Sequence, residues 1–112
     1  MSETTVVSRP VAIALDHPAF DGHFPGQPVL PGVALLAEVL EVALGEPTLA
    51  ACLGSAPRLS VVKFLAPVGP GAALVIDFRV GPRVLEWRVG ERERAVASGQ
   101  IARADIAAAT AP

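Results

Sequence analysis

Apolar side chains recur at every second position along much of the second half of the chain, with charged residues between them. A period of two places alternate residues on opposite faces of a β-strand. The alternating apolar residues are Leu74, Ile76, Phe78 and Val80 in one segment and Leu85, Trp87 and Val89 in the next. We therefore expect strands over 73–80 and 84–89, each with one face toward a core. Other apolar segments between turn sequences predict further strands over 6–15, 58–64 and 95–104.

One segment, GVALLAEVLEVAL at 32–44, has the length and composition of a helix instead. Pro31 and Gly32 mark its beginning, and Gly45 and Pro47 mark its end. Since this helix is apolar on most sides, it should also be covered on most sides. The expected fold is α+β, with an antiparallel sheet of five to six strands wrapped around one long central helix. We expect a single domain over 1–112, with a frayed tail from about residue 105.

The composition is apolar for so short a chain: 52% of the 112 residues are hydrophobic, and the mean hydropathy is +0.51. A domain of this size buries only about two-thirds of its unfolded surface, so the excess predicts a homodimer or larger assembly. The longest charge-free runs, 24–37 and 64–76, are too short and too interrupted by Pro and Gly to cross a membrane. No signal peptide is recognisable at the start, which favours a cytoplasmic protein.

Charge and cysteine content exclude several other classes. The net charge is −2 and no block of basic residues occurs, so nucleic-acid binding is not expected. The single cysteine, Cys52, excludes an internal disulfide and a cysteine-rich zinc site. Its neighbours in LAACLG indicate a small packing residue.

Histidine occurs only twice, and His23 lies nine residues before the helix begins. A helix N-terminus has free N–H groups and about half a positive charge, which polarise a carbonyl docked there. The α-proton of a docked thioester becomes more acidic, and a neutral histidine can remove it. With an acid to help a β-hydroxyl leave, these parts make a β-hydroxyacyl dehydratase. On spacing alone, a hydrogen-bonded structural histidine is the commoner interpretation. The second histidine, His17 in DHP, is expected to be an exposed loop residue.

Two motifs resemble a known family. GHFPGQPVLPGV, which contains His23, resembles the active-site signature of the hotdog-fold β-hydroxyacyl-[acyl carrier protein] dehydratases, the hydroxymyristoyl-type enzymes included. VKFLAPVGPG, at 62–71, is similar to the family's second recurring segment. The resemblance covers nearly the whole chain, from about 6 to 104. It is strongest to the short stand-alone dehydratases of aryl polyene or polyketide-type lipid pathways.

The resemblance implies a sheet wrapped around a central helix, with two subunits pairing into one continuous sheet and the active site at their interface. His23 would be the base, and the backbone N–H groups of Gly32 and Val33 would receive the thioester carbonyl. The acyl chain would lie in a tunnel along the helix, carried on the phosphopantetheine arm of an acyl carrier protein, with no metal and no other cofactor. The implied substrate-binding residues are Phe24, Pro25, Gly26, Pro31, Gly32, Val33 and Ala37.

The sequence departs from that family at the acid. The family carries a Glu or Asp on the helix fourteen residues after the histidine, contributed by the partner subunit, and here that position is Ala37. Glu41 is one turn further along the same face, about 6 Å away, whereas Glu38 is rotated by about 100°. We take Glu41 and Glu38 as candidate catalytic acids. The loop carboxylates Asp16 and Asp21 remain further candidates, and a solvated or interface position for all of them stays open.

Three functions are compatible with these residues. The first is dehydration of a 3-hydroxyacyl thioester on acyl carrier protein to the trans-2-enoyl thioester. The second is a non-catalytic subunit that binds the acyl carrier or pairs with a homologue as a heterodimer, because Ala37 cannot donate a proton. The third is an acyl thioesterase, since hotdog proteins also hydrolyse acyl thioesters. Ala37 is also the residue that would result if a catalytic acid at this position had been replaced deliberately to inactivate the enzyme.

Overall fold

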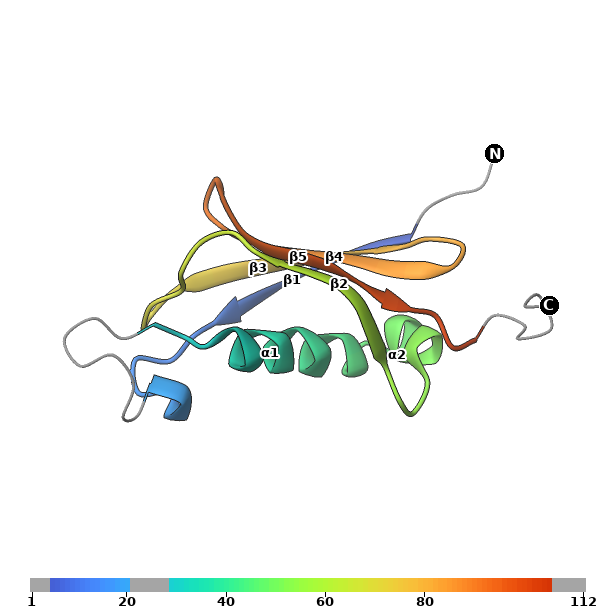
Figure 1. Cartoon of the computed structure of the whole chain (residues 1–112), viewed down its shortest axis with the longest axis horizontal. Coiled ribbons are helices and arrows are strands. Elements are labelled where there is room, and N and C mark those ends of the chain that lie inside the picture. The colour runs from blue at the N-terminus through green and yellow to red at the C-terminus, as the bar shows by residue number, and fades with distance from the viewer. Residues whose placement is uncertain (1–4, 21–28, 106–112) are drawn as a thin grey trace.

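A five-stranded antiparallel sheet covers one side of a long helix in the computed structural model, which describes residues 5–20 and 29–105 (Figure 1). The strand order is β1-β3-β4-β5-β2, so β1 and β2 form the two edges. The elements are β1 Thr5–Ala12, the 3-10 turn η1 Pro18–Phe20, α1 Gly32–Leu44, α2 Pro47–Leu53, β2 Arg58–Phe64, β3 Ala73–Val80, β4 Val84–Glu91 and β5 Arg94–Ala102. This confirms the expected α+β hotdog architecture.

The core lies between the sheet and α1. Along β3 and β4 the apolar residues of the alternating pattern face inward and are buried, apart from the half-buried Val80, as the sequence predicted. Phe78, Trp87 and Gly99 stand opposite one another on β3, β4 and β5 and form the middle row of the inner face. From α1, Leu35, Val39 and Ala43 complete this layer. These three residues are four apart, because positions i and i+4 lie on the same helix face.

The short helix α2 is not part of the expected fold. The sequence pattern predicts Pro47 only as the end of α1, but the same proline occupies the first turn of α2. Proline is favoured there, since its missing N–H would have no helical acceptor in any case. Leu49, Cys52 and Leu53 of α2 are buried in the core. The second helix therefore extends the apolar layer past the end of α1.

The first strand is shorter than expected. It ends at Ala12 rather than at residue 15, because the chain turns where the His17 N–H donates to the Ala14 carbonyl. Ile13 still reaches the core, whereas Leu15 is 77% exposed instead of facing inward. The other strands match the predicted segments closely, although β4 runs to Glu91 and β5 spans Arg94–Ala102.

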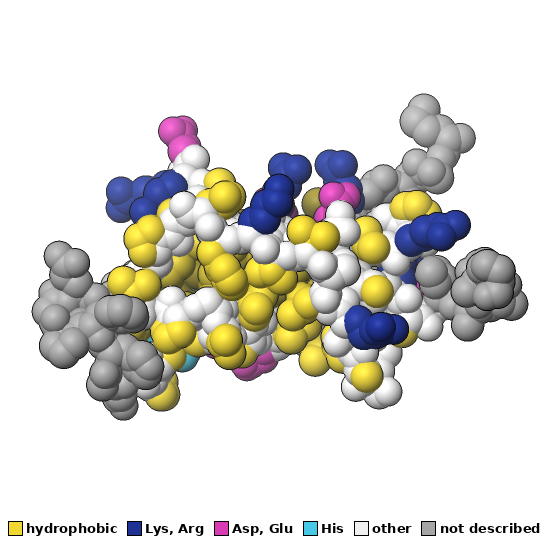
Figure 2. Space-filling view, in the orientation of Figure 1, with side chains coloured by type: hydrophobic (Ala, Val, Ile, Leu, Met, Phe, Trp, Pro, Cys, Tyr) yellow, Lys and Arg dark blue, Asp and Glu magenta, His cyan; other side chains and the backbone are white. Residues whose placement is uncertain are grey.

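One side of the molecule leaves apolar residues uncovered. The edge strand β2 and the residue after it expose Leu59, Val61, Phe64 and Leu65. On α1, Val33 is 80% exposed, and Ala37 follows it on the same open stripe. Figure 2 shows hydrophobic side chains gathered on this face, in the orientation in which Figure 1 places β2 and α1 in front. Within this single chain, α1 is therefore covered less completely than the sequence suggested. No helix among residues 5–20 and 29–105 is long and apolar enough to cross a bilayer.

Candidate functional site

A cleft of about 600 Å³ opens at the N-terminus of α1. One wall comes from the segment before α1 and the start of α1, and the other from the end of β2 and the residues after it. The lining residues are Val29, Leu30, Gly32, Val33, Leu35, Phe64, Leu65, Ala66, Pro67 and Val68. None of these side chains ionises. The cleft is therefore an apolar space that ends at the positive pole of a helix.

Backbone N–H groups are available at this end of the helix. The Pro31 carbonyl accepts hydrogen bonds from the N–H groups of Ala34 and Leu35, at 2.9 and 3.1 Å. No side chain caps the helix, and the N–H groups of Gly32 and Val33 have no acceptor in the described part of the chain. Helix-start donors of this kind, next to an apolar wall, suit an oxygen that gains negative charge during a reaction.

The wall opposite the helix is held in place by several hydrogen bonds. The N–H groups of Leu65 and Ala66 both donate to the Val96 carbonyl on β5. Arg94 donates to the Pro67 carbonyl at 3.0 Å and pairs with the Glu91 carboxylate. These contacts tie the cleft wall to the β4–β5 hairpin, which comes from a distant part of the sequence.

The candidate acids on α1 do not line this cleft. Ala37 is exposed on the open stripe with Val33, and Glu41 is exposed one turn further along the helix. Glu38 and Glu41 instead border a shallow depression of about 300 Å³ beside β1. This position of Glu38 agrees with the expected rotation of about 100° around the helix from Ala37. Asp16 is exposed in the loop after β1, and Asp21 lies outside the described residues.

Glu38 faces the other histidine of the chain. Its carboxylate lies 3.6 Å from Nε2 of His17, and both side chains are only about a fifth to a quarter exposed. Nδ1 of His17 accepts a hydrogen bond from the Ala19 N–H at 3.1 Å, and the ring packs edge-on against Phe20. The expectation that His17 is an exposed loop residue is therefore wrong. The cause is tertiary, because α1 folds back against the loop and supplies a partner on one side of the imidazole.

The structure describes only some of the other predicted site residues. His23, Phe24, Pro25 and Gly26 lie outside the described residues, and their roles stay predictions. Pro31, Gly32 and Val33 are at the start of α1, where the sequence placed them. Sequence reasoning did not single out Phe64 or Arg94. Phe64 lies within the second motif, which was the only available signal, and Arg94 gave no signal at all.

Comparison with known proteins decides the family. Residues 2–100 match the ApeI-like family, which is described as ApeI dehydratase. The chain belongs to the ApeI-like family. A curated relative, the 3-hydroxyacyl-[acyl-carrier-protein] dehydratase FabZ of Fusobacterium nucleatum, is 32% identical over 81 residues, which are 70% of this chain and 57% of the relative. The chain spans about half the length of the curated relatives that it matches.

Two solved structures share the fold of this ApeI-like chain. One is the dehydratase heterocomplex ApeI:P from Xenorhabdus doucetiae, at 26% identity and a TM-score of 0.71, covering 88% of this chain and 86% of that one. The other is an uncharacterised protein from Erwinia carotovora, at 30% identity and a TM-score of 0.74, covering 95% and 88%.

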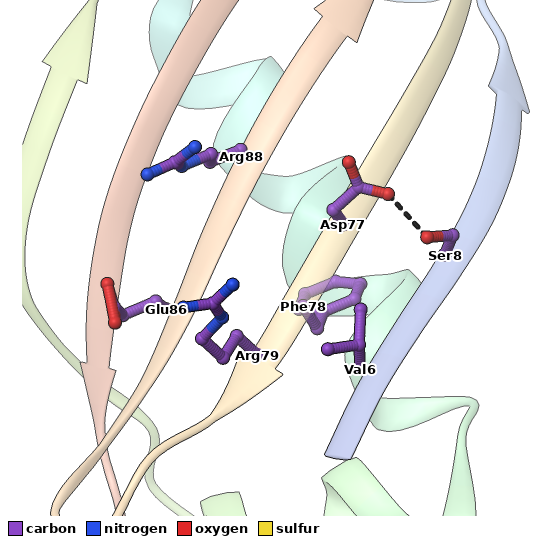
Figure 3. A pocket seen from close by; sticks show the side chains of 7 residues that line it. All are labelled: Val6, Ser8, Asp77, Phe78, Arg79, Glu86 and Arg88. Carbon is purple, nitrogen blue, oxygen red and sulfur yellow. Dashed lines mark hydrogen bonds between the residues drawn. The ribbon is translucent and has the colours of Figure 1, made fainter. Parts of the chain in front are cut away.

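The ApeI-like chain has a second groove, of about 240 Å³, on the face of the sheet away from α1 (Figure 3). It is lined by Val6, Ser8, Asp77, Phe78, Arg79, Glu86 and Arg88. Asp77 stands opposite Arg88, and Arg79 stands opposite Glu86. The Ser8 hydroxyl donates to Asp77 at 2.5 Å. Opposite charges across neighbouring strands stabilise a solvated sheet face, and the residues that line this groove all belong to strands. The cleft at α1 is the better candidate site.

Proposed function

We propose that this ApeI-like chain dehydrates a 3-hydroxyacyl thioester carried by acyl carrier protein to the trans-2-enoyl thioester. The observation that carries the proposal is the apolar cleft that ends at the N–H groups of Gly32 and Val33, which have no acceptor among residues 5–20 and 29–105. Two hydrogen bonds there would stabilise negative charge on the thioester oxygen as the α-proton leaves. The family membership and the similarity to the FabZ dehydratases support the same reaction.

In the proposed reaction, His23 takes the proton from Cα. The electron pair of that C–H bond forms the Cα–Cβ double bond, and the Cβ–O bond breaks. The departing hydroxyl receives a proton from an acid and leaves as water. The thioester arrives on the phosphopantetheine arm of the carrier, and the step requires no metal or further cofactor.

The acid is the open part of this proposal. Ala37 stands where the family has its carboxylate, and we propose Glu41 as the first candidate to act in its place. Glu41 is exposed on nearly the same helix face as Ala37, about 6 Å further along the axis, so that it would have to act through bridging water. Glu38 is the second candidate, but its carboxylate already faces His17.

We further propose a homodimer in which the β2 edges meet. An edge strand presents unpaired N–H and C=O groups, and a second strand can pair with them. The uncovered apolar residues of β2 and α1, such as Val61, Phe64 and Val33, would become buried in the same contact. The acyl chain would then lie along α1, between the two subunits.

A second candidate function is a heterodimer in which this chain is not the complete enzyme. Ala37 favours it, since a site that takes its acid from the partner subunit can be restored by a homologue that carries one. The similar structure from Xenorhabdus doucetiae is a dehydratase heterocomplex, which supports the possibility of such pairing here.

The test compares the parent with His23→Ala, Ala37→Asp, Glu41→Gln and Glu38→Gln. Each is incubated with a 3-hydroxyacyl carrier protein, and the ultraviolet absorbance of the conjugated enoyl thioester is followed. A catalytic acid or base contributes roughly 10²–10⁴-fold, so loss of His23 should lower the rate by at least ~100-fold. A comparable loss in Glu41→Gln but not in Glu38→Gln identifies the acid.

The remaining outcomes separate the alternatives. A silent parent that Ala37→Asp activates shows an intact scaffold lacking only its acid, which favours the heterodimer. Release of free thiol without enoyl product identifies a thioesterase. Inactivity of the parent, of Ala37→Asp and of mixtures with an acid-bearing homologue refutes dehydration by this chain.

A further inference from the structure

The end of β2 places an aromatic ring directly against the start of α1. A Cβ atom built on Gly32 would lie 2.7 Å from Cζ of Phe64 and 3.0 Å from both of its Cε atoms. Ordinary contacts of such an atom are 3.4 Å or longer. The ring therefore fills the space beside the Gly32 Cα, next to the N–H groups of Gly32 and Val33 and inside the cleft that Phe64 and Gly32 both line.

We propose that Phe64 makes the site selective for substrates that are unbranched at the α-carbon. This inference rests on the proposed function, because it assumes that the thioester carbonyl binds the N–H groups of Gly32 and Val33. A carbonyl oxygen accepts such bonds at about 2.9 Å, and its α-carbon is two bonds further away. The α-carbon then lies in the part of the cleft bordered by the Phe64 ring, where an added methyl group competes with the ring for the same volume.

The position of Phe64 is fixed by its backbone. It pairs with Ala97 of β5, and the next two residues donate to the Val96 carbonyl. In the single chain Phe64 is 53% exposed, so its ring can yield only by turning away from Gly32 toward the side that the proposed homodimer covers. That movement gives up the buried half of its apolar surface. An extra methyl group in an apolar pocket changes selectivity by roughly 10–200-fold, and we expect the Phe64 ring to reach at least the lower end of this range.

The experiment compares two pantetheine thioesters, 3-hydroxybutyryl and 2-methyl-3-hydroxybutyryl, the latter as a mixture of its stereoisomers. The measured quantity is the ratio of kcat/KM for the unbranched substrate over the branched one. The parent should prefer the unbranched substrate by at least ~10-fold. Phe64→Leu should lower that ratio severalfold, and because both substrates are measured on the same protein, a change in the overall rate does not affect the ratio. Val75→Ala, which shortens another exposed apolar side chain on the opposite face of the sheet, should leave the ratio unchanged.

A binding measurement keeps the inference testable without turnover. The amide analogues of the two thioesters, which cannot dehydrate readily, are titrated into the same proteins by calorimetry. The inference is supported if the parent binds the unbranched analogue with the lower dissociation constant and if this preference is smaller in Phe64→Leu. This result counts even if the parent is catalytically silent. Equal acceptance of both compounds by the parent, or an unchanged ratio in a folded Phe64→Leu, overturns the inference while leaving dehydration intact. Absence of both turnover and binding overturns the proposed function as well.

Discussion

Two glycines in tight surroundings should respond very differently to alanine. At Gly99 a Cβ would lie 2.5 Å from Cζ2 and 2.7 Å from Cε2 of Trp87, and it would also collide with the Val61 carbonyl oxygen. At Gly32 the closest atom is Cζ of Phe64 at 2.7 Å. The distances at the two glycines are similar, but the neighbouring atoms differ in how far they can move. Trp87 is 1% exposed and the Val61 oxygen belongs to a backbone ladder, whereas the Phe64 ring is half exposed.

The difference sets the expected magnitudes. In Gly99→Ala, the indole or the β2 backbone must move by about 1 Å, and overpacking of this kind costs typically 1–3 kcal/mol. Because a backbone oxygen is involved as well, we expect a loss near the upper end, ~3 kcal/mol of unfolding free energy. In Gly32→Ala, the Phe64 ring can turn toward the side that is open in the single chain, and the higher helix propensity of alanine offsets part of the cost. That variant should stay within ~1 kcal/mol of the parent.

Urea denaturation at one fixed protein concentration measures both variants, since assembly makes stability depend on concentration. Trp87 is the only tryptophan, so its fluorescence reports the core, and circular dichroism provides a probe independent of the indole. The midpoint should fall strongly for Gly99→Ala and little for Gly32→Ala, with unchanged slopes. Equal losses in the two variants, or a Gly99→Ala midpoint matching that of the parent, would refute the idea that neighbour mobility decides the cost.

Three further predictions concern single residues away from the cleft. Arg92, at the β4–β5 turn, has a left-handed backbone with φ 58°, so Arg92→Val should lower stability by about 1 kcal/mol while Arg92→Gly leaves it unchanged or higher, as thermal unfolding would show. Burial raises the pKa of the Cys52 thiol, so its reaction with a thiol reagent near pH 8 should be slow in the native protein and fast in urea; rapid native labelling would contradict its buried position. The hydrogen bond from Arg103 lowers the pKa of Asp105, so this contribution to stability is present above the ordinary aspartate pKa of about 3.9 and is lost as pH falls through the lower, native value. Asp105→Asn should therefore lower the melting temperature at pH 7, and the difference should disappear in strong acid.

Local sequence patterns were sufficient to define the inward faces of β3 and β4 and the bounds of α1. Both are local properties, because they depend on residues that are close together in the sequence. Alternation of period two marks the strand faces, and the start and end signals of α1 are Pro31, Gly32 and Gly45. The same local character explains why the start of the candidate cleft, at Gly32 and Val33, could be predicted from the sequence. The family motif around His23 added the chemistry that spacing alone left open.

Contacts between segments that are far apart in the sequence could not be predicted from local patterns. The strand order β1-β3-β4-β5-β2 requires pairing between strands far apart in the sequence, which no local period encodes. The contact of Phe64 with Gly32 and the facing of Glu38 and His17 arise in the same way. Helix α2 was missed because Pro47 ends one helix and begins the next, and local signals cannot separate the two roles. Burial against the rest of the core distinguishes them, and burial exists only once the chain has folded.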